Sequence, residues 1–164
     1  MTESADARKL RRTVALLRVT LGVIILATWW DNFQKGIYSA EGITGLFNYI
    51  FNDTGGGALL GYRGLINSTI LQFPGQFAAF QMIAEFLMGL ALLVGLLTPL
   101  AGLAATFFFL NLFLAYFGGS EWIWTYVLLT VSAFVVAWTR AGRAYGFDAR
   151  LVRQRGSPPF PFLW

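Results

Sequence analysis

The chain of 164 residues contains no cysteine and no histidine. Without cysteine it forms no disulfide and no thiolate metal site, and without histidine it lacks the usual haem ligand and general base. Charge is also scarce, because Asp, Glu, Lys and Arg make up 12% of the residues while 57% are hydrophobic. A soluble domain carries about twice that share of charge. This composition excludes a water-soluble globule, a disordered chain and a free-standing nucleic-acid binder, and we expect no nucleic-acid partner.

Four hydrophobic runs are long enough to cross a membrane, which takes about 20 mostly apolar residues. They are residues 13–30, 76–97, 99–117 and 121–139. Short connections join the second, third and fourth runs, so these three are expected to be antiparallel neighbours. The first run is expected to remain uncleaved, because Thr28-Trp29-Trp30-Asp31 offers no small-residue cleavage site. The predicted fold class is an all-α integral membrane protein, an antiparallel four-transmembrane-helix bundle over residues 1–151 with a tail over 152–164.

The positive charges lie near the two ends of the chain. Apart from Lys35 and Arg63, every lysine and arginine lies within the first 18 residues or from residue 140 onward. Cytoplasmic segments of membrane proteins are enriched in these residues, and an even number of spans places both ends on one side. We therefore predict that both termini are cytoplasmic. The basic segment 140–155 is also expected to lie against anionic membrane lipids.

The segment over residues 31–75 is long for a structureless loop. Within it apolar residues recur at helical spacing, namely Ile43, Leu46, Phe47, Ile50 and Phe51. Glu41 suits a first helical turn, and the glycines after Thr54 suit a helix end. We expect a short amphipathic helix here and a second one over 65–73, stopped by Pro74, which together cap the bundle.

Two ionisable residues, Arg18 and Glu85, fall well inside the predicted spans. A charge near the bilayer centre costs at least about 2.5 kcal/mol, so each is expected to face the bundle and to have a partner. Because arginine has a long side chain, Arg18 and Glu85 are predicted to form an ion pair. The pair either only fixes the register of the helices or also provides a polar contact for a quinone carbonyl or for a proton.

Small and polar residues share the faces that carry these charges. Gln81 and Gly89 lie one turn to either side of Glu85, and Gly22 lies one turn after Arg18. Gly102 and Thr106 form a similar face in the third run. Small residues allow close approach of helix backbones, and Asn111 can add a hydrogen bond between helices.

The outer end of the first run carries Asp31 and Lys35 at helical i, i+4 spacing. They form either a solvated salt bridge or, with Trp29 and Trp30, the lining of a pocket under the amphipathic helices. The run Phe107-Phe108-Phe109 offers a surface for a lipid, quinone or pigment tail.

Three stretches, taken in order, resemble the DoxX/DoxD family. They are Leu17-Arg18-Val19-Thr20-Leu21-Gly22 with Trp30-Asp31 and Lys35-Gly36, then Ile83-Ala84-Glu85-Phe86-Leu87-Met88-Gly89 with Gly95-Leu96-Leu97-Thr98, then Gly142-Arg143-Ala144-Tyr145-Gly146-Phe147-Asp148. The resemblance covers roughly residues 14–151. It implies a four-helix protein of a bacterial or archaeal cell membrane, one branch of which is the small subunit of thiosulfate:quinone oxidoreductase.

The resemblance marks Arg18, Glu85, Arg143 and Asp148 as the positions to carry over. Two functions remain open. In the first, the chain is the membrane subunit of a quinone-linked electron-transfer complex, with Arg18 and Glu85 as catalytic candidates. Its candidates for binding quinone are Gln81, Glu85, Trp30, Asp31 and Lys35. Any cofactor would then be a diffusible quinone, since no histidine or cysteine can ligate one.

In the second function, the chain is a non-catalytic accessory subunit packed on a larger respiratory or photosynthetic complex. Structural candidates under both functions are Arg18, Glu85, Asn111, Arg143 and Asp148. The Pro-rich, aromatic stretch 157–164, which begins with Ser157 and ends with Trp164, departs from the family pattern. It either dips into the membrane interface or docks on another subunit.

Overall fold

The structure, a computed structural model, describes residues 5–156, 158, 160 and 163–164. This part of the chain is all-α, as predicted. Its helices are α1 (Ala5–Gln34), α2 (Ala40–Asn48), α3 (Tyr62–Ser68), α4 (Pro74–Val94), α5 (Thr98–Tyr116), α6 (Trp124–Trp138) and α7 (Phe147–Arg155). Short helical turns occupy Tyr49–Asp53, Leu59–Gly61, Ile70–Gln72 and Ala141–Arg143.

Three of these helices are long and apolar enough to cross a membrane. They are Lys9–Gln34 within α1, Pro74–Val94 and Thr98–Tyr116. The fourth predicted span, 121–139, forms the shorter apolar helix α6 of 15 residues. At about 1.5 Å per residue α6 is about 22 Å long, less than the roughly 30 Å of a bilayer core. The chain is thus a multi-pass membrane protein, with three candidate spans in the part that the structure describes.

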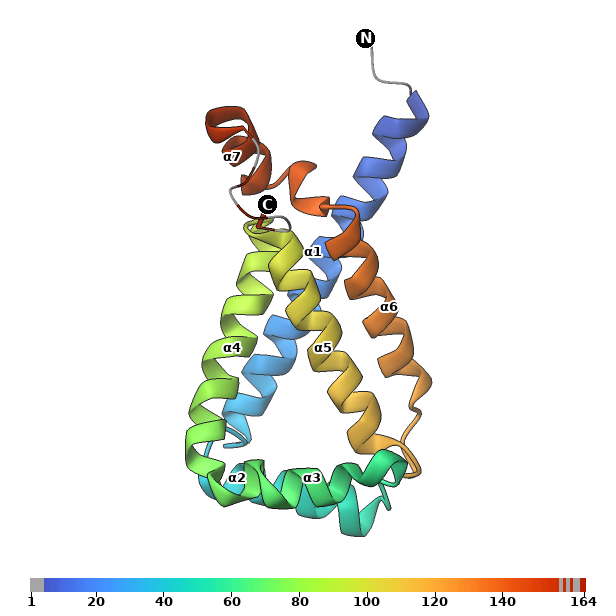
Figure 1. The fold of residues 1–164 in the computed structure, drawn as a ribbon, viewed down its shortest axis with the longest axis vertical. Helices are drawn as coiled ribbons and strands as arrows, with labels where there is room; N and C mark the ends of the chain where they lie inside the picture. The colour runs from blue at the N-terminus through green and yellow to red at the C-terminus, as the bar shows by residue number, and fades with distance from the viewer. Residues whose placement is uncertain (1–4, 157, 159, 161–162) are drawn as a thin grey trace.

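The long helices form two pairs that are close at one end and diverge toward the other (Figure 1). α1 packs mainly on α4, and α5 packs mainly on α6. The start of α1 and the whole of α7 lie at the end where the pairs meet, which we call the arginine end because it carries Arg11, Arg140 and Arg153. At the other end, called the capped end, α2 and α3 lie across the diverging helices.

Glycines set the close contacts within each pair, as the small-residue faces predicted. A Cβ atom added to Gly22 of α1 would lie 2.6 Å from the backbone nitrogen of Leu93 in α4. A Cβ atom on Gly102 of α5 would lie 2.9 Å from the Cβ atom of Ala137 in α6. These approaches leave no room for a side chain, so glycine at both positions sets the spacing of the helices.

The capped end contains a second hydrophobic core. The apolar face predicted for the segment after Ser39 is buried, with Ile43 and Phe47 in α2 and Ile50 and Phe51 in the turn that follows. The Ser39 hydroxyl accepts a hydrogen bond from the Gly42 amide at 2.9 Å, which caps the start of α2. The predicted cap of the bundle is therefore confirmed.

The second predicted amphipathic helix differs from the structure in its boundaries. The helix expected over 65–73 is split into α3 and the turn Ile70–Gln72. Pro74 does not merely end it but begins α4, two residues before the predicted start of that span. Proline suits the first turn of a helix because its missing N–H would have no partner there.

The Gly22 contact gives a direct test of the helix packing. Gly22→Ala should lower the free energy of unfolding by about 1–3 kcal/mol, because the added methyl overlaps the α4 backbone. Thermal unfolding in detergent micelles measures the change. The matched control is Gly45→Ala in α2, where an added Cβ meets no atom within 4 Å and unfolding should be unchanged or slightly delayed. Equal effects of the two variants would contradict the packing described.

Candidate functional site

Glu85 lies in the middle of α4 and is 2% exposed. Its carboxyl accepts two side-chain hydrogen bonds. The hydroxyl of Tyr38 donates to Oε2 at 2.6 Å, and Nε2 of Gln81 donates to Oε1 at 2.7 Å. Asn32, near the end of α1, interacts with the same carboxyl. Every oxygen of this buried carboxyl thus has a polar neighbour, which removes much of the cost of placing it in the membrane.

Tyr38 supplies the shorter of these two bonds from the connection between α1 and α2. Burial raises the pKa of the Tyr38 hydroxyl above its ordinary value, and its hydrogen bond to Glu85 raises it further. The hydroxyl therefore keeps its proton at physiological pH and acts as a donor to Glu85. Gln81 lies one turn before Glu85 on the same face of α4, as the sequence predicted.

A cavity of about 250 Å³ lies against this polar group, between the diverging helix pairs and beneath α2. Its polar side consists of Asn32, Gln81 and Glu85. The opposite side is apolar and aromatic, with Phe108, Phe109 and Tyr126 among its members. Two of the three phenylalanines picked out in the sequence therefore line the space that Glu85 faces.

The predicted ion pair between Arg18 and Glu85 is wrong. The Arg18 guanidinium packs against Gly95 and Gly146 at the arginine end, while Glu85 lies ten residues earlier in α4, about 15 Å along the helix. Side chains in a helix tilt toward its N-terminus. Because α1 and α4 are antiparallel, Arg18 tilts toward the arginine end and Glu85 toward the capped end, so the two diverge.

Arg18 instead belongs to a separate polar cluster, around the α4–α5 turn. It is 2% exposed, and its Nε and Nη1 atoms have no hydrogen-bond acceptor among the described residues. The carboxylate of Asp148 acts on it through space rather than by a hydrogen bond. Arg18 therefore does not line the Glu85 cavity, and its predicted contact with quinone gains no support from that cavity.

Asp148 holds the turn between α4 and α5. Its two carboxylate oxygens accept hydrogen bonds from the backbone amides of Leu97 at 2.7 Å and Thr98 at 2.9 Å. Its own amide donates to the carbonyl of Gly95 at 2.9 Å. Gly95 has φ 71°, a conformation that glycine adopts without strain, and a Cβ there would overlap the Arg18 guanidinium. The second and third stretches of the family resemblance, which end at Thr98 and Asp148, are thus in direct contact at the α4–α5 turn.

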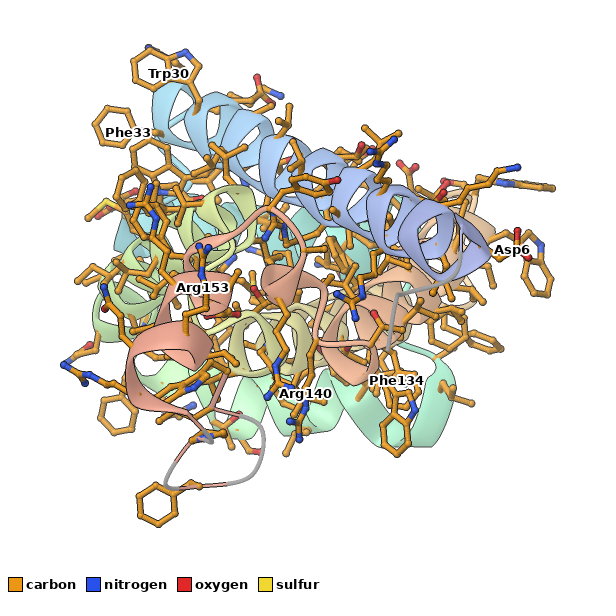
Figure 2. All side chains as sticks on the ribbon, turned by 90° about the horizontal axis from the view of Figure 1, so that it is seen from above. Asp6, Trp30, Phe33, Phe134, Arg140 and Arg153 are labelled. Carbon is orange, nitrogen blue, oxygen red and sulfur yellow. The ribbon has the colours of Figure 1, made fainter. Side chains whose placement is uncertain are left out.

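The remaining predicted positions lie elsewhere. Asp31 and Lys35 form an exposed salt bridge of 2.5 Å, as one of the two alternatives proposed. Trp30 is 56% exposed and, with Phe33, points away from the bundle (Figure 2). None of these residues lines the Glu85 cavity. Asn111 forms the expected contact between helices, since its Oδ1 accepts a hydrogen bond from the Tyr62 hydroxyl at 3.3 Å.

The described part of the tail turns back onto the chain. Nη2 of Arg143 donates to the main-chain oxygen of Trp164 at 2.9 Å, and Trp164 is 6% exposed. Of the stretch 157–164, residues 157, 159, 161 and 162 lie outside the described residues. Docking of this stretch on another subunit stays a prediction.

Sequence reasoning missed Asn32 and Tyr38. Asn32 could have been found, because it follows Arg18 and the buried Ile25 at steps of seven residues on one face of α1. Tyr38 carries no such signal. It lies in an irregular connection, and its approach to Glu85 depends on how α2 folds over the bundle.

Together the apolar helices and the enclosed carboxyl define an integral membrane helix bundle with a polar cavity near one end. The DoxX family profile matches residues 13–118, so the chain belongs to the DoxX family. The matched part includes Arg18, Gln81 and Glu85, and ends before Arg143 and Asp148. No curated protein and no solved structure matches the chain.

The hydrogen bonds of Asp148 predict that a single substitution of this residue destabilises the fold. Asp148→Asn replaces one accepting oxygen with an NH₂ group that faces a backbone N–H, and should lower the free energy of unfolding by about 1.5–3 kcal/mol. Thermal unfolding in detergent is the measurement. Asp31→Asn is the control, because an exposed salt bridge contributes less than about 1 kcal/mol. A loss for Asp148→Asn no greater than for the control would show that Asp148 does not hold the turn.

Proposed function

We propose that the chain is the membrane subunit of a quinone-linked electron-transfer complex and that the cavity at Glu85 binds the quinone head group. The observation that carries the proposal is the carboxyl of Glu85, held by Tyr38 and Gln81 at the edge of a cavity inside the bundle. Buried ionisable groups within membrane spans commonly mark substrate or proton pathways.

The size and lining of the cavity fit a ring rather than a whole quinone. At about 250 Å³ it is smaller than the roughly 300–1,000 Å³ of sites that enclose drug-sized ligands. Phe108 and Phe109 offer apolar surface to a flat ring, and Gln81 and Glu85 offer polar atoms to its carbonyl oxygens. Ile24 and Thr28, in the α1 wall, are exposed, which suits a tail that leaves the cavity into the lipid.

Reduction of a quinone to a quinol takes up two electrons and two protons. The carboxyl of Glu85 is placed to pass a proton to a quinone carbonyl oxygen, and Tyr38 and Gln81 position that carboxyl. The chain has no histidine or cysteine with which to ligate a metal redox centre. The electrons therefore come from another subunit of the complex in this proposal, and Arg18, Trp30, Asp31 and Lys35 take no direct part.

The main test is Glu85→Gln, which keeps the size of the side chain and removes its acidic proton. Binding of decylubiquinone and of a short-chain menaquinone to the purified protein should weaken about tenfold or more, because the new NH₂ group faces a donor, Tyr38 or Gln81, and disturbs the polar side of the cavity. Turnover of any quinone-reducing complex isolated with the chain should be abolished while its assembly is retained.

Glu41→Gln is the matched control, because Glu41 is an exposed carboxyl on α2 and lines no part of the cavity. It should leave quinone binding and turnover unchanged. If Glu85→Gln were as silent as this control, the quinone site would be excluded and an accessory role would account better for the chain.

We also propose that α6 completes a fourth crossing and that the arginine end faces the cytoplasm. Residues flanking α6 extend its apolar stretch, and the basic residues gather at the end of the bundle shared by α7 and the start of α1. The positive-inside rule places such an end in the cytoplasm.

Single cysteines test this topology without background, because the chain has none of its own. A membrane-impermeant maleimide should label Asp53→Cys and Ser120→Cys in intact cells, and Arg155→Cys only after permeabilisation, since all three positions are exposed. If Arg155→Cys also reacted in intact cells, Ser120 and Arg155 would lie on the same side of the membrane, α6 would not cross it, and the proposed even number of crossings would be wrong.

A further inference from the structure

The arginine end carries a second cavity, of about 990 Å³, between the start of α1, the ends of α4 and α6, and α7. Its charged lining residues are all of one kind, namely Arg11, Arg140, Arg143, Arg150 and Arg153. No carboxylate of the described chain lines it. Figure 2, viewed from this end, shows Arg140 and Arg153 on two different segments of the chain.

Asp148, a buried carboxylate near this cavity, is already engaged, because it accepts hydrogen bonds from two backbone amides of the α4–α5 turn. Burial lowers the pKa of the Arg143 guanidinium, and the charge of Arg140 lowers it further, while Asp148 opposes both effects. Nε of Arg143 is buried and has no hydrogen-bond acceptor within the described chain. Although Nη2 of Arg143 donates to the main-chain oxygen of Trp164, the Nε donor of the same guanidinium is left unsatisfied.

The rest of the lining is apolar. Val14 of α1, Val94 of α4 and Val152 of α7 line the cavity together with Trp138, which is 67% exposed. Val14, Val94 and Trp138 lie near the ends of the apolar helices, the depth at which lipid headgroups meet acyl chains. The cavity therefore combines a cationic side with an apolar side at the membrane boundary.

We propose that this cavity binds an anionic phospholipid, with its phosphodiester headgroup among Arg143, Arg150 and Arg153 and the start of an acyl chain against Val14 and Trp138. Guanidinium groups match phosphate oxygens with pairs of hydrogen bonds. A free phosphate would use the arginines alone, and the apolar side of the cavity favours the lipid.

The experiment measures retention of lipid on the purified full-length protein by native mass spectrometry. Dioleoylphosphatidylglycerol should bind more tightly than dioleoylphosphatidylcholine, which has no net charge. Arg150→Gln with Arg153→Gln should weaken phosphatidylglycerol binding about 25-fold, because each basic group near an anionic headgroup contributes roughly fivefold. Both arginines are exposed, so the double variant is expected to fold.

The matched control, Lys9→Gln with Arg155→Gln, removes two charges from the same end of the bundle at exposed positions outside the cavity. It should change phosphatidylglycerol binding less than threefold. An equal loss in the two double variants would reduce the effect to general surface charge and overturn the proposal. Equal binding of the two lipids would overturn it as well. Competition by free glycerol 1-phosphate at low millimolar concentration would assign the arginines to a soluble phosphate compound instead.

Discussion

The arrangement of this bundle depends on the carboxylate of Asp148 and the two backbone amides that it binds. The amides of Leu97 and Thr98 belong to the first turn of α5 and the residue before it, where a helix leaves N–H groups without partners. Asp148 satisfies them from the far end of the sequence and brings α7 onto the α4–α5 turn. Gly95 and Gly146 then leave just enough space for the Arg18 guanidinium. The two helix pairs are thereby held together at the arginine end.

Because the pairs are fixed at one end, their divergence opens space at the other. The helices α2 and α3 cover that space with a hydrophobic core of their own, and the connection before α2 delivers Tyr38 to Glu85. The cavity at Glu85 is thus a consequence of the fold rather than of any single helix. It places a carboxyl opposite an apolar and aromatic wall inside the bundle, and this arrangement underlies the proposed quinone site. The arginine-lined cavity lies at the opposite end, so each site can be altered without the other.

The sequence predicted the parts of this fold that follow from periodicity and from close packing. The long apolar helices, the buried face from Ile43 to Phe51 and the glycine contacts at Gly22 and Gly102 are confirmed. The predicted pairing of Arg18 with Glu85 is wrong because the packing of α1 on α4 places the Arg18 guanidinium beside Gly95, about 15 Å along the helix from Glu85. The tilt of side chains toward each helix N-terminus moves the two groups further apart. Tyr38 could not be predicted, since its place depends on tertiary packing of a connection with no periodic pattern. The family resemblance singles out Asp148 but not its partners. These are backbone amides of Leu97 and Thr98, and their contact with Asp148 depends on the tertiary packing of α7 on the α4–α5 turn.

The central claim is that the carboxyl of Glu85 is in direct contact with a quinone held in the bundle. An infrared difference spectrum, recorded as a quinone analogue is reduced electrochemically in membranes that contain the chain, reports on individual carboxyl groups. The account predicts a change in a carboxyl C=O band that is present in the wild type and lost in Glu85→Gln. No carboxyl change on reduction, or a change that persists in that variant, would contradict it.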